Sequence, residues 1–401
     1  MSQKDIAVQV PSAAYVHIPF CRRRCFYCDF PVFVVGDTYG EPSYRSQGKT
    51  SGTISQYVDA LCHEISISLA FSQPVTTIFF GGGTPSLLST EQLQCILTAL
   101  EKRFGIAAGV EISMEMDPGT YDLAQIAGYC STGVNRVSLG VQAFQDELLT
   151  VAGRSHSVND IFAAIDLINQ VEIPQFSLDL ISGLPHQSLV QWEDSLTKAV
   201  EVAPTHISIY DLTIEPGTAF GRYYKPGDNP LPTDETTVTM YQLGQKVLTG
   251  AGYEHYEISN YAKSGHQCKH NRVYWENRSY YGFGMGAASY VHGKRFTRPR
   301  KTKEYYEWLQ NGALIDCEVT PLEDELLETL MLGLRLAEGL SLTVLVEKFG
   351  KEKVEEITQC LQPYFKQGWV EVVEERLRLT DPDGFLFSNM VLAHLFEKLG
   401  E

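Results

Sequence analysis

The sequence predicts an α/β protein built on a parallel sheet and followed by a small helical domain. Six short apolar runs have the length of strands, and an amphipathic helical pattern follows each of them. Strands that alternate with helices form parallel sheets with right-handed crossovers, and their loops converge at the carboxyl ends of the strands. From about residue 313 the character of the sequence changes, and a second domain is expected there. We therefore look for the functional site at the carboxyl ends of the six strands.

The predicted elements follow one another in regular order. The six strands are expected over residues 14–18, 76–80, 110–116, 136–139, 176–181 and 206–210. Apolar residues at helical spacing predict helices over residues 54–69, 93–100, 121–129, 158–170, 188–202 and 235–249. Ser89 and Gln92 form a capping-box pattern in front of the second helix. Six strand–helix units are too few for a closed eight-stranded barrel.

The chain divides into three predicted parts, with boundaries at residues 255 and 312. Residues 1–255 form the sheet domain, 256–312 a connecting segment and 313–401 the C-terminal domain. Leucine periodicity in the last part predicts three helices, then a hairpin over 369–380 and a final helix, which is a winged-helix-like arrangement. Such modules often bind DNA, but glutamates make the wing acidic, namely Glu371, Glu374 and Glu375. We expect a lid or a partner-docking surface instead.

Composition and charge limit the classes of partner. The chain has 401 residues with 32 Lys and Arg against 49 Asp and Glu, a formal net charge of -17. Such an acidic chain is not expected to bind nucleic acid or an anionic membrane. The opening residues MSQKDIAVQVPSAAYV lack the basic start and apolar core of a secretion signal, and no apolar run is long enough to span a membrane. We therefore expect a cytoplasmic protein with reduced cysteines.

Three of the nine cysteines stand close together directly after the first predicted strand. Cys21, Cys25 and Cys28 have the spacing C-x3-C-x2-C. Three thiolates this close can hold three irons of a 4Fe–4S cluster, which leaves the fourth iron open for an exchangeable ligand. The alternatives are a zinc site, for which a second pair of cysteines is missing, and three unrelated thiols. The spacing favours the cluster.

Polar and glycine residues follow the later strands and are candidate ligand contacts. They are Gly82, Gly83 and Thr84 after the second strand, Glu115 at the end of the third, Gln142 after the fourth and Asp179 in the fifth. Carboxylates at such strand ends are costly to bury without a partner, which favours a functional role. The structural alternatives are a tight glycine turn and salt bridges. Arg154 could pair with a ligand carboxylate or with Glu147.

The cysteine loop resembles that of the radical S-adenosylmethionine (SAM) superfamily. This resemblance implies an incomplete (β/α)6 barrel related to the TIM barrel, in which the amino and carboxylate groups of SAM chelate the fourth iron. It also implies that the reduced cluster splits the sulfonium of SAM to give a 5'-deoxyadenosyl radical. The segments YVHIPFCRRRCFYCDF, GGGTPS, EMDP, RVSLGVQ, DLISGLP and YDLTIEPGT further resemble the oxygen-independent coproporphyrinogen III oxidase group. By motif, the resemblance implies SAM contacts at Tyr15, Tyr27, Gly82, Gly83, Thr84, Glu115, Gln142, Arg154, Asp179 and Leu212.

One position separates two branches of this group. The oxidases have a further cysteine two residues after the third cluster cysteine, and here Phe30 stands at that position. The sequence CDF is similar to that of the HemW haem chaperones. This difference argues against porphyrinogen oxidation.

A second motif lies far downstream. His270, Asn271, Tyr274 and Trp275 form HNxxYW, the pattern associated with haem binding in HemW proteins. Neutral imidazole is a common axial ligand of haem iron, and aromatic faces can cover a flat porphyrin. The alternative for a lone histidine beside tryptophan is a structural role. Cys268 and His266 are lower-ranked candidate ligands.

The resemblance therefore implies a haem chaperone that binds haem, a 4Fe–4S cluster and SAM, and transfers haem to acceptor haemoproteins. Respiratory and membrane-associated haemoproteins are among the candidate acceptors. The alternative is an oxygen-independent coproporphyrinogen III dehydrogenase, which decarboxylates propionate side chains oxidatively by radical SAM chemistry. Whether the protein is an enzyme, which acceptor it serves and its oligomeric state are left open at this point.

Overall fold

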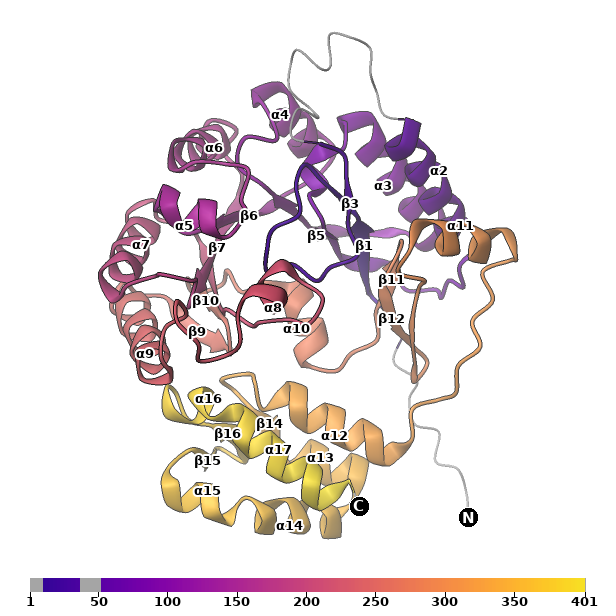
Figure 1. Cartoon of the computed structure of the whole chain (residues 1–401). Coiled ribbons are helices and arrows are strands. Elements are labelled where there is room, and N and C mark those ends of the chain that lie inside the picture. Colours follow the sequence, from indigo (N-terminus) through magenta and orange to yellow (C-terminus); the bar gives the residue numbers. More distant parts are fainter. Residues whose placement is uncertain (1–9, 37–51, 401) are drawn as a thin grey trace.

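A curved sheet forms the centre of the molecule, and helices cover its outer side (Figure 1). The computed structural model describes residues 10–36 and 52–400. Within these residues the sheet has nine strands in the order β11-β1-β4-β5-β6-β7-β8-β10-β9. No pairing joins the edge strands β11 and β9 in the described part of the chain, so the barrel is open there.

Six consecutive parallel strands of this sheet are the six that the sequence predicts. They are β1 (Ala13–Ile18), β4 (Val75–Gly82), β5 (Ile106–Met116), β6 (Arg136–Gln142), β7 (Gln175–Ser182) and β8 (His206–Asp211). Each is mostly buried, because strands of a parallel sheet are covered on both faces. The predicted α/β radical SAM fold with six strand–helix units is therefore confirmed.

Three further strands lie within residues 254–283, at and beyond the predicted domain boundary at residue 255. β11 (Tyr281–Phe283) pairs parallel to β1, while β10 (Asn260–Ala262) and β9 (Glu254–Glu257) add antiparallel strands beyond β8. They are too short to give a periodic signal of their own. The boundaries at residues 255 and 312 stay predictions, but the segment between them is an integral part of the barrel sheet.

The outer layer consists of the predicted amphipathic helices. They are α2 (Gly52–Ile67), α3 (Thr90–Phe104), α4 (Leu123–Ser131), α6 (Val158–Gln170), α7 (Leu189–Glu201) and α9 (Asp234–Gly250). The capping box of Ser89 and Gln92 is present at the start of α3. Apolar residues such as Ile65, Leu100 and Leu196 pack against the sheet with no exposure, and this layer forms the main core. Three short helices, α5 (Asp146–Val151), α8 (Ala219–Tyr223) and α11 (Thr302–Gln310), were not predicted.

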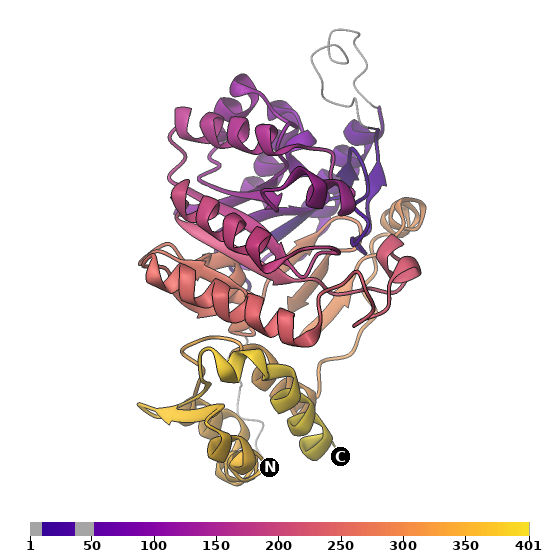
Figure 2. The same ribbon diagram turned by 60° about the vertical axis from the view of Figure 1, so that its left-hand side comes forward.

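The C-terminal part forms a module with its own core, below the barrel in Figure 2. Leu330, Leu334, Ile357 and Leu377 meet in this core. Its helices are α12 (Leu322–Gly333), α13 (Leu342–Phe349), α14 (Lys351–Cys360), α15 (Gln362–Gln367), α16 (Asp383–Leu386) and α17 (Ser388–Leu399). Strands β14 (Leu340–Ser341), β15 (Val370–Val373) and β16 (Arg376–Leu379) form an antiparallel sheet that includes the predicted hairpin.

Helix α10 (Lys269–Trp275) lies between the barrel and this module (Figure 1). Arg272 on α10 forms an ion pair of 2.6 Å with Glu338 of the module. Just after α10, the Asn277 amide donates a hydrogen bond of 3.4 Å to the hydroxyl of Thr329 on α12. The helix that carries the HNxxYW motif therefore joins the two parts of the molecule. In the part of the chain that the structure describes, every helix is too short or too polar to cross a membrane.

Candidate functional site

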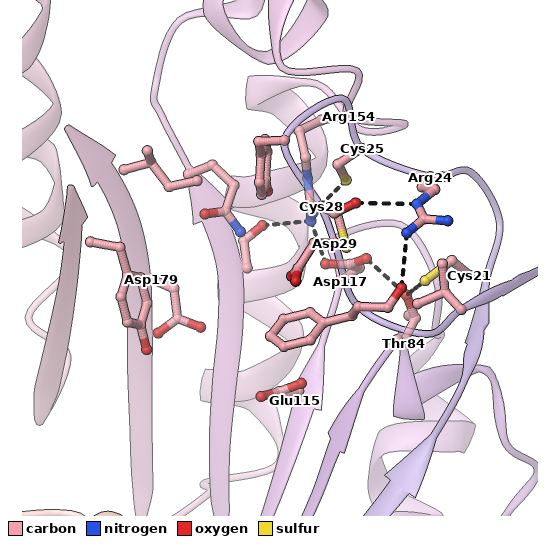
Figure 3. A pocket seen from close by; sticks show the side chains of 18 of the residues that line it. Cys21, Arg24, Cys25, Cys28, Asp29, Thr84, Glu115, Asp117, Arg154 and Asp179 are labelled. Atoms are coloured by element: carbon pink, nitrogen blue, oxygen red, sulfur yellow. Dashed lines mark hydrogen bonds and ion pairs between the residues drawn. The ribbon is translucent and has the colours of Figure 1, made fainter. Parts of the chain in front are cut away.

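The three clustered cysteines line one cavity at the carboxyl ends of the barrel strands (Figure 3). Cys21 ends the short strand β2 (Phe20–Cys21), which pairs with β3 (Phe33–Val34), and Cys25 and Cys28 lie in the loop between these strands. Backbone hydrogen bonds of Phe26 to Ala152 and Phe220, 3.0 and 2.9 Å long, hold the loop over the barrel. The cavity has a volume of about 410 Å³.

The donor chemistry of the three cysteines suits an iron–sulfur cluster, because soft thiolate sulfur is the usual ligand of such clusters. Among the described residues, no three Cys, His, Asp or Glu side chains converge as ligands of one metal ion. A zinc ion needs its ligands within about 2.3 Å of one point, whereas a 4Fe–4S cluster places each cysteine on a different iron. Burial raises the pKa of the Cys21 thiol to about 12, so the cationic irons of a cluster would be needed to keep it ionised. The donor set therefore fits the cluster that the sequence predicts.

Arg154 connects the cysteine loop with the strand ends. Its guanidinium donates hydrogen bonds to Cys25 Sγ at 3.3 Å and to the carbonyl of Gly140 at 3.1 Å, and it forms an ion pair with Asp117. Asp117 also accepts a hydrogen bond of 3.0 Å from Thr84, whose hydroxyl lies 3.7 Å from Cys21 Sγ. This network links two of the three clustered cysteines, Cys21 and Cys25, through one carboxylate (Figure 3). Arg154 thus pairs with Asp117 and not with Glu147, whose carboxylate accepts from Gln191.

Neighbouring atoms leave no room for a side chain at two glycines of the turn at the end of β4. A Cβ atom on Gly82, whose φ is 112°, would lie 2.3 Å from the imidazole of His17, and one on Gly83 would lie 2.7 Å from the carbonyl oxygen of Phe20. The N–H of Gly82 donates to Glu115 at 2.9 Å. Gly82 and Gly83 therefore meet a packing requirement of the turn. The turn also holds the carboxyl group of Glu115 at the cavity wall.

Two partly buried carboxyl groups, Glu115 on β5 and Asp179 on β7, line the cavity. Burial raises the pKa of Glu115 to about 8, and the hydrogen bond from Gly82 only partly opposes this. Burial likewise raises the pKa of Asp179 to about 6, although the hydroxyls of Ser208 and Ser138 stabilise its charged form. At neutral pH without a bound ligand, Glu115 is therefore mostly protonated and can donate a hydrogen bond.

Most of the predicted SAM contacts meet at this cavity. The residues that line it together with the three cysteines are Tyr27, Gly82, Gly83, Thr84, Glu115, Gln142, Arg154, Asp179 and Leu212. Gln142 has a φ of 68°, an uncommon backbone conformation for a residue other than glycine that is often found at functional sites. Tyr15 lies elsewhere: its ring lines a second cavity of about 240 Å³ deeper in the barrel.

The second cavity, called here the inner cavity, brings the HNxxYW motif close to the first. His270, Asn271 and Tyr274 line it from α10. Five residues border both cavities: Phe30, Glu115, Ser138, Asp179 and Tyr210. The motif that the sequence places more than 240 residues after the cysteines therefore reaches the same barrel interior.

Both ring nitrogens of His270 have hydrogen-bond partners. Nδ1 lies 2.9 Å from the hydroxyl of Thr77, and Nε2 lies 2.8 Å from the hydroxyl of Tyr274. The ring is fully buried and stacks on Phe79 with ring centroids 5.3 Å apart. Burial lowers its pKa to about 3, so the imidazole is neutral, the form that ligates metals.

Trp275 of the motif and the lower-ranked candidates Cys268 and His266 differ in their surroundings. Trp275 does not line the inner cavity, and its side chain hydrogen-bonds to the buried carboxyl of Glu257. Cys268 is buried with Sγ 3.8 Å from Glu111, and burial raises its pKa to about 12. Cys268 also lines the inner cavity beside His270. His266 is only partly buried and does not line either cavity.

Comparison with known proteins assigns the chain to a family. The model of the radical SAM superfamily matches residues 15–199, and that of the HemN C-terminal domain matches residues 320–386. A heme chaperone HemW from Synechocystis sp. is 46% identical over 98% of this chain and 98% of its own length. The chain belongs to the HemW family. The heme chaperone HemW of Escherichia coli is 36% identical and covers 95% of this chain and 97% of its own.

The fold of this HemW-family chain is also that of a solved structure. Coproporphyrinogen III oxidase (HemN) from Escherichia coli, described as a radical SAM enzyme, superimposes with a TM-score of 0.80. The match covers 96% of this chain and 90% of the oxidase, at 23% sequence identity. The two proteins therefore share the barrel and the C-terminal module.

Two residues of the site in this HemW-family chain were missed from sequence. Asp117 lies just after β5 in the segment EMDP, two residues beyond Glu115, and this i, i+2 spacing at a strand end could have indicated it. Glu111 accepts hydrogen bonds from the backbone N–H groups of Lys269 and His270, at 3.3 and 3.1 Å, and so caps α10. No local pattern indicates Glu111, because its partners are about 160 residues away.

Proposed function

We propose that this HemW-family protein holds a 4Fe–4S cluster, SAM and haem, and transfers the haem to acceptor haemoproteins. The observation that carries the proposal is that α10 turns His270 of the HNxxYW motif into the inner cavity, which shares walls with the cysteine-lined cavity. The heme chaperone name of relatives that match along nearly the whole chain supports the same function.

In this proposal Cys21, Cys25 and Cys28 hold the cluster, and the cavity beside them takes SAM. A cluster held by these three cysteines would, when reduced, supply an electron for cleavage of the sulfonium of SAM. The protein's contribution is to orient the ligand: the Arg154 guanidinium, held by Asp117, is placed to meet a carboxylate, and Glu115 and Asp179 offer carboxyl groups to polar atoms. The ring of Tyr27 and the side chain of Leu212 add apolar surface to the wall of the same cavity.

The haem part of the proposal assigns the axial ligand to His270. A ligating histidine usually has its second ring nitrogen fixed by a hydrogen bond, which Thr77 provides at Nδ1. Nε2 would then take the iron once the Tyr274 hydroxyl leaves it. The inner cavity, at about 240 Å³, is smaller than the roughly 300–1,000 Å³ of ordinary ligand sites, so haem binding requires α10 to move.

Transfer to acceptor haemoproteins in the cytoplasm completes the proposed function, with membrane-associated respiratory proteins among the acceptors. The acidic C-terminal module adjoins α10 and is a suitable docking surface. Its wing carries Glu371, Glu374 and Glu375, so a basic acceptor surface would complement it.

A haem titration tests the proposal directly. The wild type should develop the absorption of histidine-ligated haem with saturable binding, and the His270→Ala variant should lose this spectrum. His63→Ala, which removes an exposed histidine of α2, is the matched control and should bind like the wild type. Absence of saturable haem binding by the wild type would overturn the proposal.

The role of the cluster needs a second experiment. If the cluster drives haem transfer, a Cys25→Ser variant should load haem at His270 but fail to pass it to an apo-haemoprotein under reducing conditions with SAM. Unchanged haem transfer by this variant would show that the cluster is not needed for the transfer. The rival function, coproporphyrinogen III dehydrogenase, predicts anaerobic conversion of coproporphyrinogen to protoporphyrinogen by the reduced protein with SAM. That product would contradict a chaperone-only function.

A further inference from the structure

A third pocket lies beside α10 and shares no lining residue with the cysteine-lined cavity or the inner cavity. It has a volume of about 340 Å³ and opens at the amino ends of the barrel strands. Its walls come from the first residues of β4 and β5, from α10 and from the turn that follows: Thr76, Thr77, Ala107, Ala108, Gly109, Val110, Lys269, Arg272, Val273 and Arg278. We call it the basic pocket.

The charge of the basic pocket is opposite to that of the chain. Three of its wall residues are cations, Lys269, Arg272 and Arg278, and none of its wall residues is acidic, although the chain has a net charge of -17. Arg272 and Arg278 also form ion pairs with Glu276, 2.8 and 2.7 Å long, but this carboxylate does not line the pocket. Lys269 is exposed and forms no ion pair with another described residue. An anionic group in the pocket would therefore meet the Lys269 ammonium directly, and it would share the two guanidinium groups with the carboxylates of Glu276 and Glu338.

The rest of the wall is apolar and close to His270. Val273, Val110 and two alanines provide a surface for an apolar body. Thr77 belongs to this wall, and the same hydroxyl lies 2.9 Å from Nδ1 of His270. Thr77 therefore separates the basic pocket from the Nδ1 side of the His270 ring, across the ring from the Nε2 atom proposed to take the iron.

We propose that the basic pocket binds the carboxylates of the haem propionates. The inference rests on the proposed function. It adds that haem approaches the barrel from the amino ends of the strands, which lie opposite the cysteine-lined cavity. A tetrapyrrole with two carboxylates on an apolar ring matches a pocket with cations on an apolar wall, and the guanidinium groups suit carboxylates by their fork geometry. The volume lies within the roughly 300–1,000 Å³ of ordinary ligand sites.

The inner cavity is the competing location for these carboxylates, and it fits less well. Its wall contains one arginine, Arg136, which is already engaged by Gln175 at 2.6 Å and by Glu111 at 4.0 Å. The same wall carries the carboxyl groups of Glu115 and Asp179, which would repel a second anion once ionised. The basic pocket has more cations and no acidic wall residue.

The test compares haem with haem dimethyl ester, in which both carboxylates are masked. Spectroscopic titrations are made on the full-length wild type, the double variant Lys269→Gln/Arg278→Gln and the control Lys102→Gln, which removes an exposed cation of α3. We expect the double variant to bind haem about tenfold or more weakly, as loss of charged hydrogen bonds implies, and to bind the ester like the wild type. The wild type should bind the ester about as weakly as the double variant binds haem, and Lys102→Gln should match the wild type.

The outcomes separate this inference from the proposed function. Equal affinity of the wild type for haem and its ester, or equal affinity of the double variant and the control for haem, would overturn the inference. The proposed function would still stand if His270→Ala abolished haem binding in the same titrations. A wild type that binds neither compound would overturn both. Thermal unfolding of each variant shows that the surface substitutions leave the fold intact, and SAM binding should be unchanged in all of them.

Discussion

Arg154 and Asp117 form a mostly buried ion pair at the base of the cysteine-lined cavity. The same guanidinium donates to Cys25, and the same carboxylate accepts from Thr84, which lies against Cys21. One ion pair therefore connects the surroundings of two of the three clustered cysteines, Cys21 and Cys25 (Figure 3).

Replacing Asp117 by Asn should weaken SAM binding. The variant leaves Arg154 without the charge that positions it, and loss of a charge-assisted contact corresponds to about tenfold or more in affinity. Equilibrium binding of SAM to the cluster-loaded protein measures the change. Glu147→Gln is the control, because Glu147 is close in sequence but bonds to Gln191 instead. Equal SAM affinity in the two variants would contradict this role of Asp117.

Glu115 should make the ligand-free protein less stable as the pH rises. Its pKa is about 8 in the folded protein against a usual 4.5, so the folded state holds a proton that the unfolded state releases. The contribution of this proton to the free energy of unfolding is complete below pH 4.5 and is lost progressively up to about pH 8. Over this range the free energy of unfolding falls by at most about 1.4 kcal/mol per pH unit.

Urea unfolding of cluster-free protein at several values between pH 5 and pH 8 measures this dependence. Glu115→Gln should flatten the decline, because the amide does not titrate. The smaller contribution of Asp179, whose pKa is about 6, should remain in the variant. An identical pH dependence in the wild type and the variant would show that Glu115 ionises normally.

Tyr274→Phe should speed the binding of haem. The Tyr274 hydroxyl occupies Nε2 of His270, so a ligand that takes this nitrogen must first break the hydrogen bond. Removing a hydrogen bond of ordinary net strength corresponds to an increase of about two- to tenfold in the association rate. Stopped-flow absorbance in the haem band follows the reaction, with Tyr280→Phe as a neighbouring control that leaves His270 untouched. A slower reaction would indicate that the iron does not bind Nε2 of His270.

Arg298→Met should strongly destabilise the barrel. Arg298 Nε lies 2.7 Å from Glu64, both side chains are almost fully buried, and Glu64 also accepts from Gly284 and Tyr305. Removing one partner of a buried pair leaves an uncompensated charge, at a cost of about 3–5 kcal/mol in the free energy of unfolding. Arg295→Met, whose partner Glu328 is more exposed, should cost at most about 1 kcal/mol. Chemical denaturation compares the two, and equal losses would contradict the burial argument.

Much of the fold was predictable because its signals are local. Strand β7 and helix α6 follow from apolar residues at periods of two and about 3.6, and Ser89 with Gln92 marks the start of α3 within four residues. Strands β10 and β11 could not be predicted in this way, since three residues give no period. Their place in the sheet depends on β8 and β1, which lie far away in the sequence.

The sequence by itself determined the six strand–helix units, the spacing of Cys21, Cys25 and Cys28, and the HNxxYW motif. Each of these features depends only on residues that are close together in the sequence. The tertiary structure alone decided that Arg154 pairs with Asp117, that Tyr15 faces the inner cavity and that Thr77 and Tyr274 hold both nitrogens of His270. These contacts join residues on different strands and helices. They depend on how the sheet curves and how α10 closes its amino end, which no local spacing encodes.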